Sequence, residues 1–376
     1  MDVIDGKAQG EPRLVKSDIG DIGRGLGFTR RGAYYYNLSV STGGDIHVVE
    51  LNPETGRIQE KPAVLATRFG NKLEPAWSPD GRRLAFYRRT GPDSWAPGWR
   101  TLYLRSGQTG EERELRNDLI LYGGIQWFPD GRSLLVSACR DRRDFRIDYF
   151  RMDVETGATS LLMQREDGAG TFWPGLSPDG KTIFFTYYEK ESGKSYSGPG
   201  DCFLGSYQIE TGQEKELCPI PPRDQGARSD VPVSPQRARQ SIAVSPDGRQ
   251  VAFVVHEGPW PVTSVVKTID PENGQLREVF RSPWPGFIPG NQGLEWTPDG
   301  HHLLIVRGSM STEIGELLRV PAKGGKAQEV GLTGKSLSSP SIHPDGRHLA
   351  FRAGSDDSNE VWVMENFLKA GKGKDK

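Results

Sequence analysis

The chain has 376 residues, and its 47 glycines and 27 prolines make about one residue in five a turn-former. A hydrophobic content of 35% is enough for a packed core, so the composition excludes a disordered or low-complexity chain. The 48 basic and 49 acidic residues give a net charge of -1, which excludes a strong overall attraction to nucleic acid or to anionic membranes.

The N-terminal segment, residues 1–10, has neither the basic start nor the apolar stretch of a signal peptide. Its first six residues repeat the spacing of residues 152–157, so this lead-in is either the remnant of a longer chain or a frayed terminus. No run in the sequence approaches the roughly 18 apolar residues of a membrane helix. We therefore expect no membrane insertion.

From residue 28 onward the chain repeats one pattern. Six copies of Pro-Asp-Gly and one degenerate copy end at Gly32, Gly81, Gly131, Gly180, Gly248, Gly300 and Gly346. Proline favours the first corner of a type I turn, aspartate bonds the backbone there, and glycine accepts the left-handed position that follows. Each copy therefore predicts a hairpin, within a unit of about fifty residues.

A second turn follows in most units, as at residues 155–157 and 272–274, so each unit contains two hairpins and four antiparallel strands. Four-stranded sheets repeated at this period stack radially as blades around a channel. The sequence predicts an all-β fold, a seven-bladed β-propeller of four-stranded antiparallel blades, as a single domain over residues 11–368.

The seventh unit lacks a fourth strand, because the chain runs from residues 361–364 toward a Lys/Gly tail, residues 369–376, which we expect to be disordered. Residues 11–16 resemble the fourth strands of other units. We therefore expect this N-terminal strand to pair into the last blade and close the ring, which would remove exposed sheet edges.

The Ser-Pro-Asp-Gly copies at 78–81, 177–180 and 245–248, with variants that begin at Phe128, Thr297 and His343, resemble the repeats of the TolB-like, WD-repeat-like propeller family. The resemblance covers residues 11–367 and implies the propeller fold. Family members include protein-binding propellers of the periplasm, sensor domains, peptidase gating domains and a few lyases. The resemblance leaves a periplasmic or extracellular location open, should the chain belong to a longer precursor.

Function is expected on the face where the loops after second and fourth strands gather, because the sequence stops repeating there. The candidate ligand-binding residues in these loops and at the adjoining strand ends are Trp95, Trp99, Arg140, Arg143, His256, Trp260 and Trp284. The tryptophans are either stacking anchors or loop-packing aromatics. The arginines either bind an anionic group or pair with neighbouring aspartates.

The residue before the large apolar side chain of each first strand is small in five of the seven units. Close packing of the blades near the axis explains this preference. Gln126 and Glu295 depart from it, and we expect them to line the channel or to belong to a ligand site.

The sequence contains no Gly-x-Ser-x-Gly nucleophile elbow, and we expect no catalytic residue, metal or cofactor. His301, His343 and His348 flank Pro-Asp-Gly turns and His302 begins a strand, so we interpret them as turn and strand residues rather than metal ligands. The turn aspartates are interpreted as turn caps.

The leading hypothesis is a non-catalytic propeller that binds a peptide, protein or oligosaccharide at the loop face. It would act as a monomer or as a sensor or interaction domain of a larger assembly, with no nucleic-acid partner. One alternative is a propeller lyase acting on acidic sugars, in which arginines neutralise a carboxylate. Another is the gating domain of a prolyl-oligopeptidase-type serine peptidase whose catalytic domain is absent from this chain.

Overall fold

The computed structural model describes residues 2–4, 7–9, 22–29, 33–40, 44–65, 72–89, 100–141, 147–164, 173–188, 202–220, 242–258, 262–289, 293–309, 314–354 and 358–364. All regular elements within these ranges are β-strands. Accordingly, no helix in them has the length and apolar character needed to cross a membrane.

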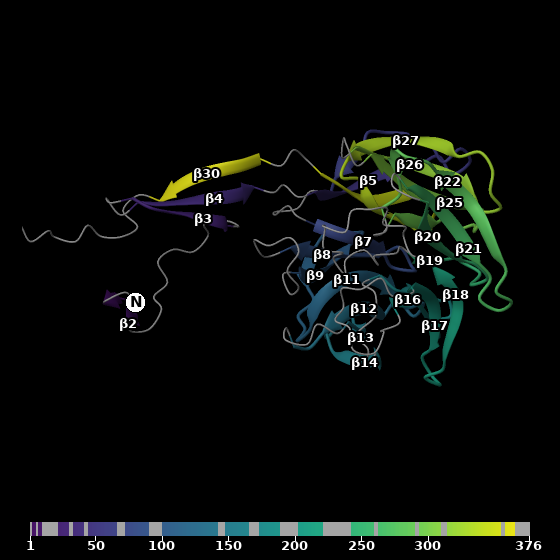
Figure 1. Cartoon of the computed structure of the whole chain (residues 1–376), viewed down its shortest axis with the longest axis horizontal. Helices are drawn as coiled ribbons and strands as arrows, with labels where there is room; N and C mark the ends of the chain where they lie inside the picture. The colour runs from purple at the N-terminus through teal and green to yellow at the C-terminus, as the bar shows by residue number, and fades with distance from the viewer. Residues whose placement is uncertain are drawn as a thin grey trace, which may run out of the picture.

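Six antiparallel sheets form the body of the molecule (Figure 1), and we number them as blades 1 to 6. Blade 1 contains β7 (Lys72–Trp77), β8 (Arg83–Arg89), β9 (Arg100–Ser106) and β10 (Glu112–Glu114). Blade 2 contains β11 (Ile120–Trp127), β12 (Ser133–Cys139), β13 (Asp148–Asp153) and β14 (Thr159–Met163). Blade 3 contains β15 (Gly175–Leu176), β16 (Thr182–Tyr188), β17 (Cys202–Gln208) and β18 (Glu214–Ile220).

The second half of the body is built in the same way. Blade 4 contains β19 (Ile242–Val244), β20 (Val251–Glu257), β21 (Thr263–Ile269) and β22 (Leu276–Ser282). Blade 5 contains β23 (Gly286–Phe287), β24 (Leu294–Trp296), β25 (His302–Ser309), β26 (Ile314–Pro321) and β27 (Gln328–Lys335). Blade 6 contains β28 (Ser338–Ile342), β29 (His348–Ala353), β5 (Asp45–Glu50) and β6 (Ala63–Val64).

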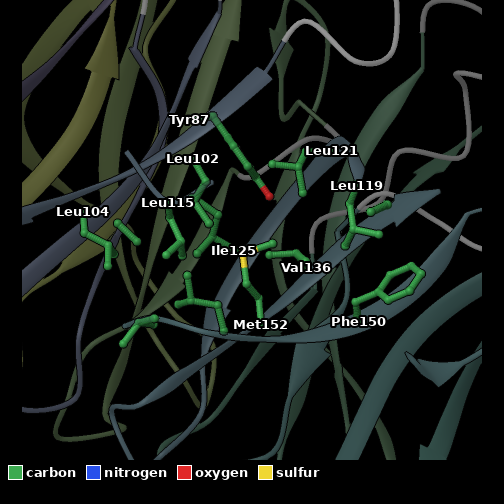
Figure 2. Packing of buried hydrophobic residues seen from close by; sticks show 14 of the residues in the cluster. Tyr87, Leu102, Leu104, Leu115, Leu119, Leu121, Ile125, Val136, Phe150 and Met152 are labelled. Atoms are coloured by element: carbon green, nitrogen blue, oxygen red, sulfur yellow. The ribbon is translucent and has the colours of Figure 1, made fainter. Parts of the chain in front are cut away.

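The blades follow one another around a ring. The inner strands β7, β11, β15, β19, β24 and β28 contact each other in this order, and β28 contacts β7 again. Each of the six junctions between neighbouring blades holds its own apolar cluster. Figure 2 shows the cluster between blades 1 and 2, where Tyr87 and Leu102 of blade 1 pack with Ile125 and Val136 of blade 2.

The six Pro-Asp-Gly turns lie where the sequence predicts them. In each, the glycine N–H donates to the carbonyl three residues earlier, and the glycine φ lies between 61° and 73°. The degenerate copy at Gly32 lies outside the described residues. These turns repeat faithfully because their geometry depends only on local chemistry.

The described residues form six blades rather than the predicted seven. β29 pairs with β5, with Phe351 opposite His47, so the two ends of the chain share blade 6. Residues 361–364, which the repeat places as the third strand of the last unit, belong instead to β30 and pair with β4. β5 fills the third-strand place because Ile46 then packs into the junction with blade 1 and Val49 into the junction with blade 5. Residues 11–16, predicted to close the ring, lie outside the described residues, as do residues 369–376.

Two small sheets lie outside the six blades. β3 (Ile22–Phe28), β4 (Tyr34–Val40) and β30 (Ser358–Met364) form a three-stranded sheet that stands apart from the body, at the left of Figure 1. Its large exposed side chains are Leu26, Phe28, Tyr35 and Val363. β1 (Asp2–Ile4) and β2 (Lys7–Gln9) pair as a hairpin within the N-terminal lead-in.

Candidate functional site

The inner strands bring one residue of each blade close to the next blade around the channel. Gly175 shows why this position is small, because a Cβ added there would lie 2.8 Å from the Ile242 side chain and 2.9 Å from that of Val244. In blade 6 the position holds Ser341, whose Oγ accepts the N–H of Trp77 in blade 1 at 3.2 Å. Side chains at this position therefore reach the backbone edge of the following blade.

Glu295 occupies the same position in blade 5 and makes the same kind of cross-blade contact. Its carboxyl group accepts the N–H of Ile342 in blade 6, which lowers its pKa slightly. Burial among the inner strands is the larger effect and raises the pKa of Glu295 to about 8. Glu295 is half-buried, and its raised pKa favours the protonated, neutral carboxyl at pH 7.

This raised pKa predicts a change of stability with pH. The folded state favours the protonated carboxyl, so Glu295 stabilises most below its ordinary pKa of 4.5 and loses this contribution as the pH rises toward 8. Glu295→Gln keeps an acceptor for Ile342 and cannot ionise. We expect the free energy of unfolding, measured with urea at pH 5, 6.5 and 8, to fall less steeply with rising pH for this variant than for the wild type.

Glu272→Gln provides the matched control, because Glu272 lies in an exposed outer turn. It should leave the pH profile of the unfolding free energy unchanged. Equal slopes for Glu295→Gln and the wild type would show that the carboxyl is ionised in the folded state.

The loop-face end of the inner strands carries a β-bulge in three consecutive blades. The register shifts fall between residues 338 and 341 in blade 6, 73 and 76 in blade 1, and 123 and 126 in blade 2. The bulged residues Ser339, Glu74 and Gly124 have φ of 53°, 57° and 68°. We call these three residues, with Arg100, the bulged rim.

Two of the bulged residues carry backbone strain. Left-handed φ values are costly for residues with a Cβ, and Glu74 and Ser339 also each precede a proline, which normally favours extended backbone. Such strain persists only where the surroundings enforce it, and it concentrates at binding and catalytic sites. Bulges at a sheet end also re-aim side chains.

The bulge in blade 1 directs the Glu74 carboxylate toward blade 2. One oxygen accepts a hydrogen bond from Nη1 of Arg100 at 2.5 Å, and the other accepts the N–H of Gly124 at 2.8 Å. The Glu74 side chain is 7% exposed, whereas that of Arg100 is 22% exposed. The arginine is thus the member of the pair that faces solvent, and it also lies 5.7 Å from the ring centre of Tyr87.

A second polar and aromatic group lies at the loop end of blades 4 and 5. The His256 ring stacks on Phe287 with 4.8 Å between centres. Ser264 Oγ accepts the N–H of Ile288 at 3.1 Å and lies 3.1 Å from His256 Nδ1. The hydroxyl has one proton and two lone pairs, so it can pair with either tautomer of His256. Trp284, three residues before Phe287, is half-buried.

The comparisons with solved structures agree with this architecture. TolB from Acinetobacter baumannii matches with a TM-score of 0.50 and 18% identity, over 85% of this chain and 66% of that one, just under two thirds of its length. A provisionally named TolB from Agrobacterium tumefaciens matches with a TM-score of 0.59 and 15% identity, over 83% of this chain and 99% of that one. The chain has a TolB-like β-propeller fold. No protein-family model matches the sequence, and no curated protein matches it significantly.

The TolB-like propeller separates several of the predicted site residues. Gln126 lies in blade 2 and Glu295 in blade 5. These blades are on opposite sides of the ring of six blades, so the two residues do not form one site. Arg140 is exposed at the loop end of blade 2, with its guanidinium 5.5 Å from the ring centre of Phe150. The predicted residues that lie outside the described ranges are Trp95, Trp99, Arg143 and Trp260.

Sequence reasoning missed Glu74 and Arg100, the two charged members of the bulged rim. One signal was available, because the X-Pro pairs Glu74-Pro75 and Ser339-Pro340 occupy the same place in their units. In each pair the proline lies two residues before the large apolar side chain of the first strand. An X-Pro pair at this place marks where the strand departs from regular pairing.

Proposed function

We propose that this propeller is a binding module that takes a peptide or protein segment at the loop face, centred on the bulged rim. The observation that carries the proposal is the strained Glu74 backbone, which holds a carboxylate against Arg100 and the Gly124 N–H. A structural ion pair can form without a left-handed glutamate. Strained backbone is typical of binding and catalytic sites, so the strain at Glu74 favours a ligand-binding role for this rim.

Arg100 defines the chemistry of the ligand in this proposal. A guanidinium has five N–H donors in a planar fork, and the contact with Glu74 engages Nη1. The remaining donors suit a carboxylate or a backbone carbonyl, such as a peptide C-terminus or an acidic side chain. The part-exposed arginine would contact this group, while Glu74 holds the guanidinium in place.

The experiment uses a displayed library of random peptides, panned against the whole chain. Selected peptides are resynthesised and their affinity is measured for the wild type, Arg100→Gln and Glu74→Gln. Arg100→Gln is expected to weaken binding about tenfold or more, as loss of a charge-assisted hydrogen bond would. Glu74→Gln keeps a side-chain oxygen that can accept from Arg100 and so hold the guanidinium, but it removes the competing negative charge, so affinity is expected to stay equal or rise.

A loss of affinity in Arg100→Gln that Glu74→Gln does not share cannot come from damage to the fold, because both variants alter the same ion pair. Arg277→Ala, at an exposed arginine of β22, is the matched control and should bind as the wild type does. Peptides that bind all variants equally would place the peptide site elsewhere. If no peptide is selected, acidic oligosaccharides are tested in the same way. Oligosaccharide binding to the wild type that Arg100→Gln loses would show that the ligand is a sugar and not a peptide.

A further inference from the structure

The sixth Pro-Asp-Gly turn differs from the other five in its chemistry. It reads His343-Pro344-Asp345-Gly346-Arg347-His348, with an imidazole at both ends. His343 Nδ1 lies 3.0 Å from one oxygen of Asp345, and His348 Nδ1 lies 2.7 Å from the other. One ligand atom from each of the three residues lies within 4.8 Å of the other two.

In four other turns a hydroxyl group supplies the hydrogen that the aspartate needs. The side chains of Ser78, Ser177, Ser245 and Thr297 donate to the first carboxylate oxygen at 2.5 to 2.6 Å. In the remaining turn, Ser133 and Arg151 donate to Asp130. In the sixth turn, His343 stands at the position of these hydroxyl residues, and its Nδ1 is the atom that lies beside the aspartate.

The surroundings of His343 show which of its nitrogens carries the hydrogen. Nε2 lies 3.0 Å from the carbonyl oxygen of Gly81 in blade 1, and a carbonyl only accepts, so Nε2 is the donor. With Nε2 as donor, Nδ1 carries the lone pair, which the backbone N–H of Asp345 approaches at 3.2 Å and beside which an Asp345 oxygen lies at 3.0 Å. A cation between Nδ1 and that oxygen, either a proton or a metal ion, would take the lone pair in place of the N–H contact.

We propose that His343, Asp345 and His348 bind a divalent transition-metal ion, with Zn²⁺ as the reference ion. Two imidazole nitrogens and a carboxylate oxygen are preferred zinc ligands, and water would complete a tetrahedral set. The bond from Nε2 of His343 to the Gly81 carbonyl is the outer-shell contact that typically orients a metal-binding histidine. Asp345 and His348 are exposed, so an ion can enter from solvent.

The position of the site gives the ion a structural consequence. His343 lies in blade 6, yet it contacts two residues of blade 1. Its ring bonds the Gly81 carbonyl and lies nearly perpendicular to the Trp77 ring, with 4.9 Å between ring centres. A Cβ on Gly81 would lie 2.2 Å from His343 Nε2, so the ring is closely seated. A bound ion would fix a side chain that spans the junction where the first and last blades meet.

The test titrates the metal-free whole chain with Zn²⁺ and Co²⁺, following heat, the visible spectrum of bound Co²⁺ and the unfolding temperature. We expect one ion per chain and an unfolding temperature that rises with ion concentration. His343→Ser restores the hydroxyl that four other turns use, so it should fold normally. Because loss of an outer-shell partner alone costs 10 to 100-fold, His343→Ser and His348→Gln should each weaken binding by about 100-fold or more.

His301→Gln, in the exposed part of the blade 5 turn, is the matched control and should bind the ion as the wild type does. Absence of saturable binding to the wild type would overturn the proposal, as would binding that survives both His343→Ser and His348→Gln. The site is on the turn face, so its failure would leave the proposed peptide site on the loop face untouched.

Discussion

Gly157→Ala is expected to destabilise the protein far more than Gly274→Ala, although both glycines end the same outer turn and share a φ of +74°. A Cβ on Gly157 would lie 2.0 Å from the backbone carbonyl oxygen of Arg116, whereas a Cβ on Gly274 meets nothing within 4 Å. The left-handed backbone alone costs about 1–2 kcal/mol. Forced displacement of a backbone carbonyl adds about 1–3 kcal/mol for Gly157→Ala.

The measurement is the urea midpoint of each variant against the wild type, with far-UV circular dichroism as the signal. Gly274→Ala serves as the control for the backbone cost. Similar midpoints for the two variants would mean that the outer turn of blade 2 does not pack on the segment after β10 that contains Arg116.

Phe86→Ala should remove about 3–5 kcal/mol from the free energy of unfolding, as large-to-small changes at fully buried aromatic residues do. Phe86 is 0% exposed and lies at the junction of blades 1 and 6, with Ile46 and Ala350 from the neighbouring blade 6. Its ring stacks on Tyr103 with 5.8 Å between centres, so truncation leaves a cavity bounded by side chains from both ends of the chain.

Chemical denaturation of Phe86→Ala and of Leu276→Ala compares this site with a surface position. Leu276 is 46% exposed, and its truncation should change stability by no more than about 0.5 kcal/mol. A neutral Phe86→Ala would contradict the contact between blades 6 and 1, because Phe86 would then be exposed on an open sheet face.

The strands and turns could be predicted from the sequence because their causes are local. Asp80 illustrates this, since the Ser78 hydroxyl and the N–H of Arg82 bond its carboxylate and hold its pKa below the usual value. The four residues of that turn contain all the information needed for its shape. The all-β class and the blade repeat follow from six copies of this turn.

The number of blades could not be predicted in the same way. The choice depends on whether β29 pairs with β5 or with β30, and both are short strands that contain three or four apolar residues. Pairing of strands about 300 residues apart is decided by which side chains fill the neighbouring junctions. Ile46 of β5 is completely buried there, while Val363 of β30 is 44% exposed in the separate sheet.

Part of the candidate site can be predicted from the sequence. Glu295 breaks the rule of small residues at its position, and such an exception is visible in a sequence. Glu74 breaks no rule of composition. Its role depends on a bulge and on the approach of Gly124 from the next blade, and both are properties of the assembled ring.

The shared sixth blade sets the order in which the molecule can be completed during synthesis. β5 and β6 leave the ribosome early, but β29, which pairs with β5, is translated nearly 300 residues later, which takes roughly 15–60 s at 5–20 residues per second. Throughout that interval the edge of β5 that pairs with β29 stays unsatisfied in the nascent chain. Translation products that stop before residue 338 would keep this edge permanently and are natural clients for chaperones.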